Sequence, residues 1–99
     1  MDLTAKTATQ MVRTLAADSS QVFFTKHAED RMKARKVTRM QVLRCLTKGL
    51  IVEGPAKSVK GNWEFRLECV SAGDALNVVA ALDSDGNGTF VVVITAYWV

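Results

Sequence analysis

The spacing of the hydrophobic residues changes near Leu50, and this change restricts the folds that the chain can adopt. Before Leu50, apolar residues recur at three- and four-residue intervals, as they do on one side of an amphipathic helix. After it, they alternate with polar residues or form short apolar runs, which are typical of strands. A chain with its helices first and most of its strands afterwards forms an α+β domain. Its 99 residues predict a single domain over residues 1–99.

Threonine and glycine residues mark where the helices are expected to start and end. Threonine before an apolar period favours a helix start, and glycine after one favours a helix end. Helices are expected over residues 4–17, from Thr25 to about Lys36, and from Thr38 to Gly49. The short apolar run at residues 22–24 predicts a strand between the first two helices.

The second half of the chain predicts a meander of strands. They are expected over residues 50–53, closed by Gly54 and Pro55, and over residues 62–70, 76–82 and 89–99. Within residues 62–70, charged residues alternate with apolar ones, so this strand has one polar face. We therefore expect N-terminal helices packed on one face of an antiparallel sheet of about four strands. The other face is expected to be partly open and able to hold a site.

Positive charge is concentrated in one segment. Residues 26–48 contain eight Lys and Arg against Glu29 and Asp30, a net charge of +6, whereas the whole chain carries +3 and the remainder therefore −3. Such a segment predicts an anionic partner, and RNA is the partner we consider first. The side chains expected to bind nucleic acid are Lys26, Lys33, Arg35, Lys36 and Arg39.

The same segment contains the only histidine of the chain. On a helix, His27, Arg31 and Arg35 lie at i, i+4 and i+8 and therefore share one face. Histidine exchanges protons near neutral pH, and arginine binds phosphate oxygens through a fixed fork of donors. This face is a candidate for phosphate binding or catalysis. The alternative is a histidine that only forms hydrogen bonds near a helix start, next to a solvated basic face.

Two strand residues are further candidates. Arg66 lies between Glu64 and Glu68 on the polar face, where it either joins a ladder of cross-strand salt bridges or meets an anion from the sheet side. In the second case Glu64 or Glu68 would orient His27 or act as a base. Thr95 lies late in the apolar last strand. Its hydroxyl either points into a cleft or only reflects the preference of threonine for strands.

No metal or cofactor is expected. Cys45 and Cys69 fit no CxxC pattern and are interpreted as two reduced packing residues, with a disulfide or a metal pair as the alternative. Residues 83–88 match the first half of a calcium loop, but Ile94 stands where that loop needs Glu, so a hairpin turn is favoured. The sequence has no signal-peptide pattern and no run of about 20 apolar residues, which predicts a soluble, cytoplasmic protein without a membrane span.

Three motifs carry a family resemblance. The chain reads KHAEDRMKAR from Lys26, GLIVE from Gly49 and GNWEFRL from Gly61. It thereby resembles a bacterial family of small domains with no assigned function, whose hallmark is KHAxxRMxxR after a strand, then G-x-I-V/I-E, then GNW/Y-x-x-R-L. The final VVVIT run from Val91 also looks like the last strand of that family.

The resemblance extends to RelE-, ParE- and BrnT-like toxins and to other small metal-independent ribonucleases. It implies helices against a curved four-stranded antiparallel sheet, with residues 20–99 as the toxin-like core and residues 1–19 as an added N-terminal helix. It also implies pairing with an antitoxin protein. The matching site positions are His27, Arg31, Arg35, Arg66 and Thr95.

Two functional hypotheses follow. The first is a toxin-like RNA-binding domain that acts as a metal-independent endoribonuclease, in which His27 or Glu64 moves protons and the arginines hold the phosphate. The second is a non-catalytic module that binds a protein or nucleic acid through the basic helices or the last strand. A homodimer through residues 89–99 is the simplest form of the second hypothesis.

Overall fold

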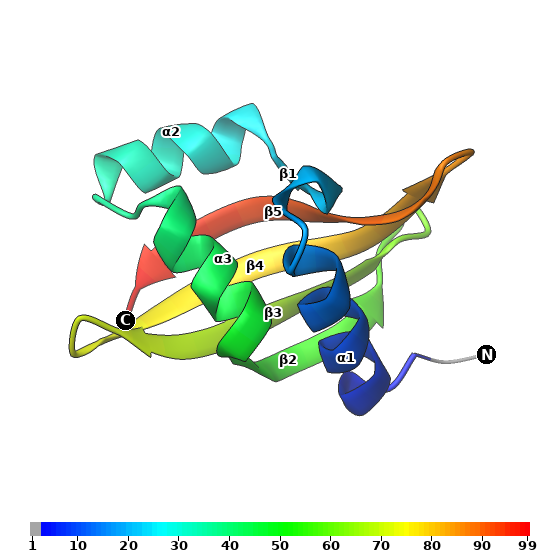
Figure 1. Ribbon diagram of the computed structural model, residues 1–99, viewed down its shortest axis with the longest axis horizontal. Coiled ribbons are helices and arrows are strands. Elements are labelled where there is room, and N and C mark those ends of the chain that lie inside the picture. The colour runs from blue at the N-terminus through cyan, green and yellow to red at the C-terminus, as the bar shows by residue number, and fades with distance from the viewer. Residues whose placement is uncertain (1–2) are drawn as a thin grey trace.

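The computed structural model describes residues 3–99 and has three α-helices and a five-stranded sheet. Helices α1 and α3 cross one face of the sheet, and α2 lies beside β5, toward the end of the sheet that β1 closes (Figure 1). The elements are α1 (Ala5–Ala16), a 3-10 turn (Ser19–Gln21), β1 (Val22–Phe24), α2 (Lys26–Ala34), α3 (Arg39–Lys48), β2 (Leu50–Lys57), β3 (Trp63–Ser71), β4 (Asp74–Asp85) and β5 (Gly88–Trp98). This order confirms the predicted α+β class.

The sheet has the strand order β1-β5-β4-β3-β2. Strands β2 to β5 form the predicted antiparallel meander. The prediction of about four antiparallel strands is nevertheless incomplete, because β1 adds a fifth strand that runs parallel to β5, with Val22 opposite Val91 and Phe24 opposite Val93. A three-residue strand carries too little pattern to reveal its partner or its direction. The sheet is therefore mixed.

Threonine caps begin all three helices, as predicted. Each threonine side chain accepts a hydrogen bond from the backbone N–H three residues later, and the third also forms a full capping box with Gln41. The cap residues are Thr4, Thr25 and Thr38. These caps satisfy backbone donors that the helix itself leaves free.

Helix α2 ends at Ala34, two residues before the predicted end at Lys36. Lys36 has a φ of 57°, in the left-handed region, so it cannot continue the helix. The N–H of Val37 donates to the carbonyl of Met32 at 2.8 Å, and the N–H of Lys36 donates to that of Lys33 at 3.3 Å. These are the two bonds of a Schellman motif, here with lysine at the position that usually holds glycine.

Strand β2 continues to Lys57, although the sequence predicted its end at Glu53. Its pairing with β3 shifts register twice, between Ile51 and Glu53 and again between Glu53 and Ala56. Because β2 is an outer strand, it tolerates both these irregularities and Pro55, which has no N–H to donate.

The predicted turn between the last two strands is a hairpin. Asp85 is paired with Gly88, which leaves a two-residue loop, and the N–H of Asn87 donates to the Asp85 carboxylate at 2.8 Å. Strands flank the segment on both sides, as the hairpin interpretation requires and the calcium-loop interpretation does not. Within residues 3–99, no group of three or more His, Cys, Asp or Glu residues is placed to hold a metal ion.

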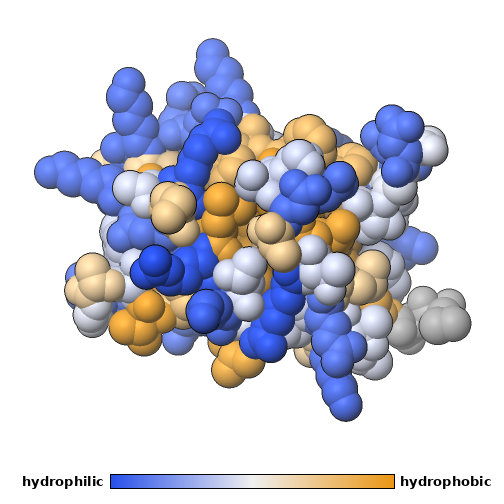
Figure 2. Space-filling view, viewed as in Figure 1, coloured by the Kyte–Doolittle hydropathy of each residue, from blue (hydrophilic) through white to orange (hydrophobic). Residues whose placement is uncertain are grey.

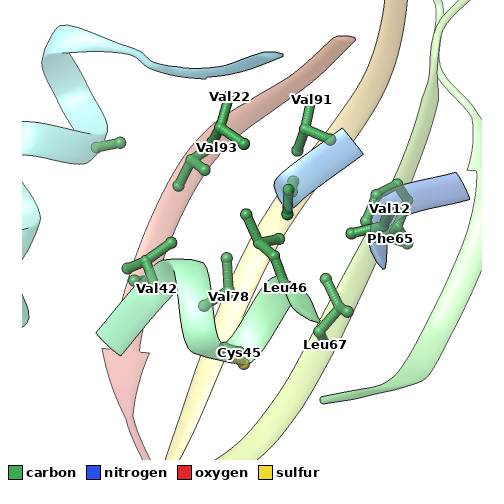
Figure 3. Close-up of a cluster of buried hydrophobic side chains, with 14 of the residues drawn as sticks. Val12, Val22, Val42, Cys45, Leu46, Phe65, Leu67, Val78, Val91 and Val93 are labelled. Atoms are coloured by element: carbon green, nitrogen blue, oxygen red, sulfur yellow. The ribbon is translucent and has the colours of Figure 1, made fainter. Parts of the chain in front are cut away.

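The hydrophobic core lies between the helices and the sheet (Figure 3). All three helices contribute to it, and so do β1, β3, β4 and β5. On β3, Phe65 and Leu67 are buried in the core, so Glu64 and Arg66 lie on the opposite face, as predicted. Burial of each large aliphatic side chain contributes about 1.5–3 kcal/mol relative to exposure.

Both cysteines are free, which agrees with the interpretation as reduced packing residues. Cys45 is fully buried, and its thiol lies 3.9 Å from the carbonyl oxygen of Leu76. Burial, with smaller contributions from neighbouring Cys69 and Glu68, raises the pKa of the Cys45 thiol well above its usual range. Cys45 therefore stays protonated and acts as a small apolar residue.

The helix-bearing face is shown in Figure 2. Hydrophilic side chains project around its rim, and hydrophobic residues are visible near its centre. The helices of residues 3–99 are too short or too polar to cross a membrane. The face of the sheet turned away from α1 and α3 holds the candidate site.

Candidate functional site

The face of the sheet opposite α1 and α3 contains a cavity of about 500 Å³. Three small or aliphatic residues from β4 and β5 form its floor: Ala81, Val92 and Ile94. Ala81 lies between Glu64 and Val92 on the neighbouring strands. It is only 1 % exposed yet is not part of the core cluster. The cavity walls, rather than the core, therefore cover Ala81.

The walls come from segments that are far apart in the sequence. They are Thr25 and His27 at the start of α2, the loop residues Ser58, Val59, Lys60 and Asn62, and the strand residues Glu64 and Asp83. The sequence analysis singled out His27 and Glu64, and both contribute to this one cavity. The site is thus a concave surface with an apolar floor and polar walls, the usual character of a ligand pocket.

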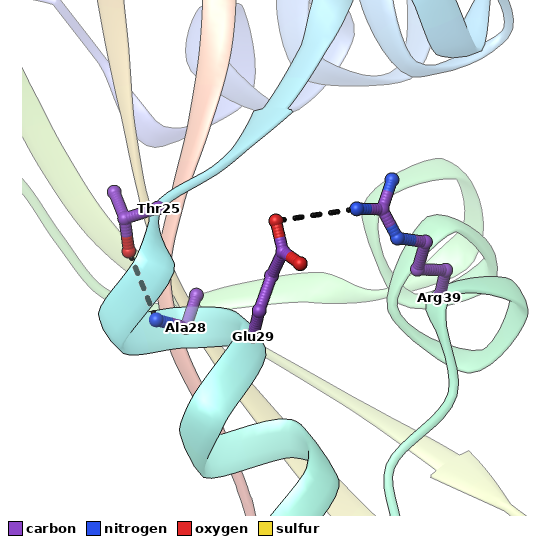
Figure 4. A network of polar contacts seen from close by, with 4 residues as sticks. All are labelled: Thr25, Ala28, Glu29 and Arg39. Carbon is purple, nitrogen blue, oxygen red and sulfur yellow. Dashed lines mark hydrogen bonds and ion pairs between the residues drawn. The ribbon is translucent and has the colours of Figure 1, made fainter.

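The parallel pairing of β1 with β5 positions His27. The N–H of Thr25 donates to the carbonyl of Val93 at 3.2 Å, so the chain stays beside β5 until α2 begins. The Thr25 hydroxyl then accepts from the N–H of Ala28 at 2.9 Å and caps the helix (Figure 4). The first turn of α2 therefore lies at the rim of the sheet, with the exposed imidazole of His27 next to the cavity.

A bulge in β5 shapes the floor. Val79 is paired with Thr95 and Ala80 with Val93, so Ile94 has no partner on β4. An extra residue of this kind changes the direction of nearby side chains, and bulges are frequent beside functional sites. Here the unpaired Ile94 lines the cavity.

Arg35 connects the end of α2 to β5. Its guanidinium donates to the Thr95 hydroxyl at 3.3 Å and to the carbonyl of Ala96 at 3.0 Å, and it lies 5.9 Å from the ring centre of Tyr97. The Trp98 indole N–H donates in turn to the carbonyl of Arg35 at 2.9 Å. Thr95 and Arg35 are therefore in contact with each other, and much of the role of Arg35 is to hold α2 on the sheet.

Arg31 lies between His27 and Arg35 along the helix, one turn from each. Its side chain is exposed. Since His27 lines the cavity and Arg35 reaches β5, the helix face predicted from the i, i+4, i+8 spacing is the one turned toward the open side of the sheet.

Arg66 lies next to this cavity rather than in it. It lines a smaller cavity of about 200 Å³, and Glu64 lines both. Its guanidinium is 3.7 Å from the carboxylate of Glu53 on β2, and it donates to the side-chain oxygen of Asn77 on β4. Arg66 thus forms a cross-strand ion pair with Glu53 and with neither Glu64 nor Glu68, both of which are exposed.

Asn77 is a polar residue that the sequence analysis missed. It is fully buried, and its side-chain nitrogen has no acceptor among the described residues. A buried donor without a partner costs roughly 1–3 kcal/mol. The signal was present in the sequence, because Asn77 is the one polar residue of the run 76–82.

The predicted basic surface is divided between two sides of α2. Arg39 pairs with Glu29 at 3.3 Å (Figure 4), and its guanidinium lies 4.6 Å from the ring centre of Phe24. Lys33 and Arg39 line a separate cavity of about 400 Å³ between α2 and α3, away from His27. Lys26 and Lys36 are exposed near the two ends of α2.

The cavity that holds His27 has mixed charge. Its ionisable side chains are His27, Lys60, Glu64 and Asp83. The sequence analysis missed Lys60 and Asp83, because both lie outside the basic segment and only the tertiary fold brings them to His27. The sequence indicated only that the basic loop around Lys60 and the acidic turn at Asp83 connect strands, and it did not indicate that they lie near His27.

Comparison with known proteins identifies the family. Residues 24–98 match the sequence model of a family described as a domain of unknown function, DUF4258. The chain belongs to this family. No curated protein and no solved structure matched it. The matched region begins after α1 and includes every residue that lines the His27 cavity.

Proposed function

We propose that this domain binds RNA on the open face of its sheet and cleaves it without a metal ion, as the RelE-, ParE- and BrnT-like toxins that it resembles suggest. The observation that carries the proposal is that His27 and Glu64 line one cavity. An imidazole can move a proton during the reaction, and a carboxylate in the same site can accept hydrogen bonds from the substrate.

The reaction would be an internal transesterification. His27 takes the proton of a ribose 2′-hydroxyl, whose oxygen attacks the adjacent phosphorus. A water molecule gives a proton to the departing 5′-oxygen, and the products are a 2′,3′-cyclic phosphate and a free 5′-hydroxyl. Arg31, exposed one helical turn after His27, and Arg66, partly exposed in the neighbouring cavity, would stabilise the charge that develops on the phosphate.

A single-turnover cleavage assay on a labelled RNA tests the proposal. Acid–base catalysis contributes about 10²–10⁴-fold, so His27→Ala should lower the cleavage rate by at least a hundredfold. Arg39→Ala is the matched control, because Arg39 belongs to the same basic segment but lies on the other side of α2. A His27→Ala protein that melts like the parent and cleaves equally fast would leave the histidine with a structural role only.

A second candidate is binding to a partner protein, either an antitoxin or a second copy of the chain. The last strand offers only part of the edge considered for this purpose, because β1 pairs with residues 91–93 and Arg35 donates to the Ala96 carbonyl. The outer strand β2 is a better candidate, since Leu50 is 64 % and Val52 49 % exposed. Light scattering that detects only monomer at high protein concentration would exclude the homodimer.

A further inference from the structure

We propose that the His27 cavity binds a guanine base, so that the domain selects the nucleotide beside the scissile bond. This inference rests on the proposed function and specifies its substrate. The cavity of about 500 Å³ lies within the usual range of small-molecule sites, roughly 300–1,000 Å³. Its floor of Ala81, Val92 and Ile94 offers an apolar surface for the face of a flat ring.

Three ionisable groups around the floor are free to bind a ligand. Among residues 3–99, no hydrogen bond or ion pair engages the side chains of His27, Lys60 or Glu64. Asp83 differs, because one of its oxygens already accepts from the N–H of Ser84 at 2.8 Å. Glu64 is therefore the freest acceptor of the cavity, and Lys60 is its strongest free donor.

This pair of groups favours guanine over the other bases. An ionised carboxylate only accepts hydrogen bonds, and it binds most strongly where two donors lie side by side. Guanine alone among the four bases carries two adjacent donors, N1–H and the N2 amino group, and its O6 acceptor lies next to them, where a lysine can donate. Uracil, cytosine and adenine would each place a ring or carbonyl acceptor against the carboxylate.

The base could come from a free nucleotide or from a strand of RNA, and the test separates the two sources. Fluorescence anisotropy measures binding of four labelled oligonucleotides that differ at one central base, and calorimetry measures binding of GMP and AMP. We expect the guanine oligonucleotide to bind about tenfold more tightly than the others. Glu64→Gln should reduce this preference to less than twofold, because an amide presents a donor as well as an acceptor.

Two further variants complete the design. Glu68→Gln is the matched control, because Glu68 lies on the same strand and the same face but outside the cavity, and it should keep the tenfold preference. Ala81→Leu fills the space above the floor without removing an ionisable group, and it should weaken binding of the guanine oligonucleotide by at least tenfold. If Ala81→Leu does not fold, the Glu64→Gln comparison alone decides.

The outcomes for the base site and for the proposed function are distinct. If the parent binds RNA without base preference and Glu64→Gln changes nothing, the guanine site is refuted while RNA binding stands. If the parent binds GMP in a Glu64-dependent way but binds no oligonucleotide, the guanine site stands and the RNA function is refuted. If it binds neither GMP nor RNA, both proposals are refuted.

Discussion

Gly49 follows α3 in the chain and lies where the end of this helix packs on β3, the strand that carries Glu64. It offers a sharp test of this packing. Its φ of −76° and ψ of 174° are open to any residue, so glycine is not required for its backbone conformation. A Cβ at this position would instead lie 2.5 Å from the carbonyl oxygen of Cys45 and 3.0 Å from that of Glu68. The sequence predicted Gly49 as the end of α3. The structure adds that glycine is needed there for space.

The cost of Gly49→Ala can be worked from these distances. Ordinary contact begins near 3.5 Å, so the Cys45 carbonyl at 2.5 Å must move by about 1 Å. The same carbonyl accepts the N–H of Gly49 at 2.7 Å, and this hydrogen bond is strained as well. Overpacking lowers the free energy of unfolding by about 1–3 kcal/mol, and the strained hydrogen bond lowers it by about 1 kcal/mol. The smaller conformational freedom of the unfolded alanine variant offsets about 0.4–1 kcal/mol of this loss. We expect a net loss of about 1–3 kcal/mol.

Urea unfolding followed by tryptophan fluorescence measures this loss, and the melting temperature should fall by about 10 °C. Gly86→Ala is the matched control, because a Cβ at Gly86 would meet no atom within 4 Å and its φ is not in the left-handed region. It should change stability by less than about 0.5 kcal/mol. A Gly49→Ala protein as stable as the Gly86→Ala protein would show that α3 and β3 are not packed as described.

Two further predictions concern α2 and the core. Lys36→Gly should stabilise the protein by about 0.5–1 kcal/mol in urea unfolding, because glycine occupies the left-handed position of a Schellman motif without the strain of a side chain; a loss of stability would contradict this. The raised pKa of the buried Cys45 thiol predicts that stability falls as pH rises above 9, because the unfolded chain ionises this thiol first and thus binds fewer protons than the native state. Cys45→Ala should remove this part of the pH dependence, and an unchanged slope would contradict the assignment.

Local interactions explain what the sequence could predict. The helix starts at Thr4, Thr25 and Thr38 depend on hydrogen bonds that span three residues, so a short segment of sequence contains both the donor and the acceptor. The two faces of β3 follow from a period of two residues and need no partner strand.

Long-range pairing explains what the sequence could not predict. Nothing in residues 22–24 indicates that they pair in parallel with β5, yet this pairing places His27 at the cavity. The bulge at Ile94 and the register shifts of β2 likewise depend on neighbouring strands. The ladder partner of Arg66 proved to be Glu53, because register selects the partner and the sequence offers several nearby carboxylates.

The net charge of a sequence segment is a weak guide to the charge of any one surface of the folded domain. This difference reduces the number of basic side chains that could bind one RNA together. The segment 26–48 carries +6, but Arg35 reaches β5, whereas Lys33 and Arg39 line the cavity between α2 and α3, where Glu29 pairs with Arg39. The cavity itself combines Lys60 and His27 with two carboxylates. An RNA bound as proposed would place its phosphates near Arg31 and Arg66 at the border of the cavity and a base in its interior. Binding through so few phosphates should depend weakly on salt, with a slope near −1 to −2 instead of the value that all eight basic residues would give.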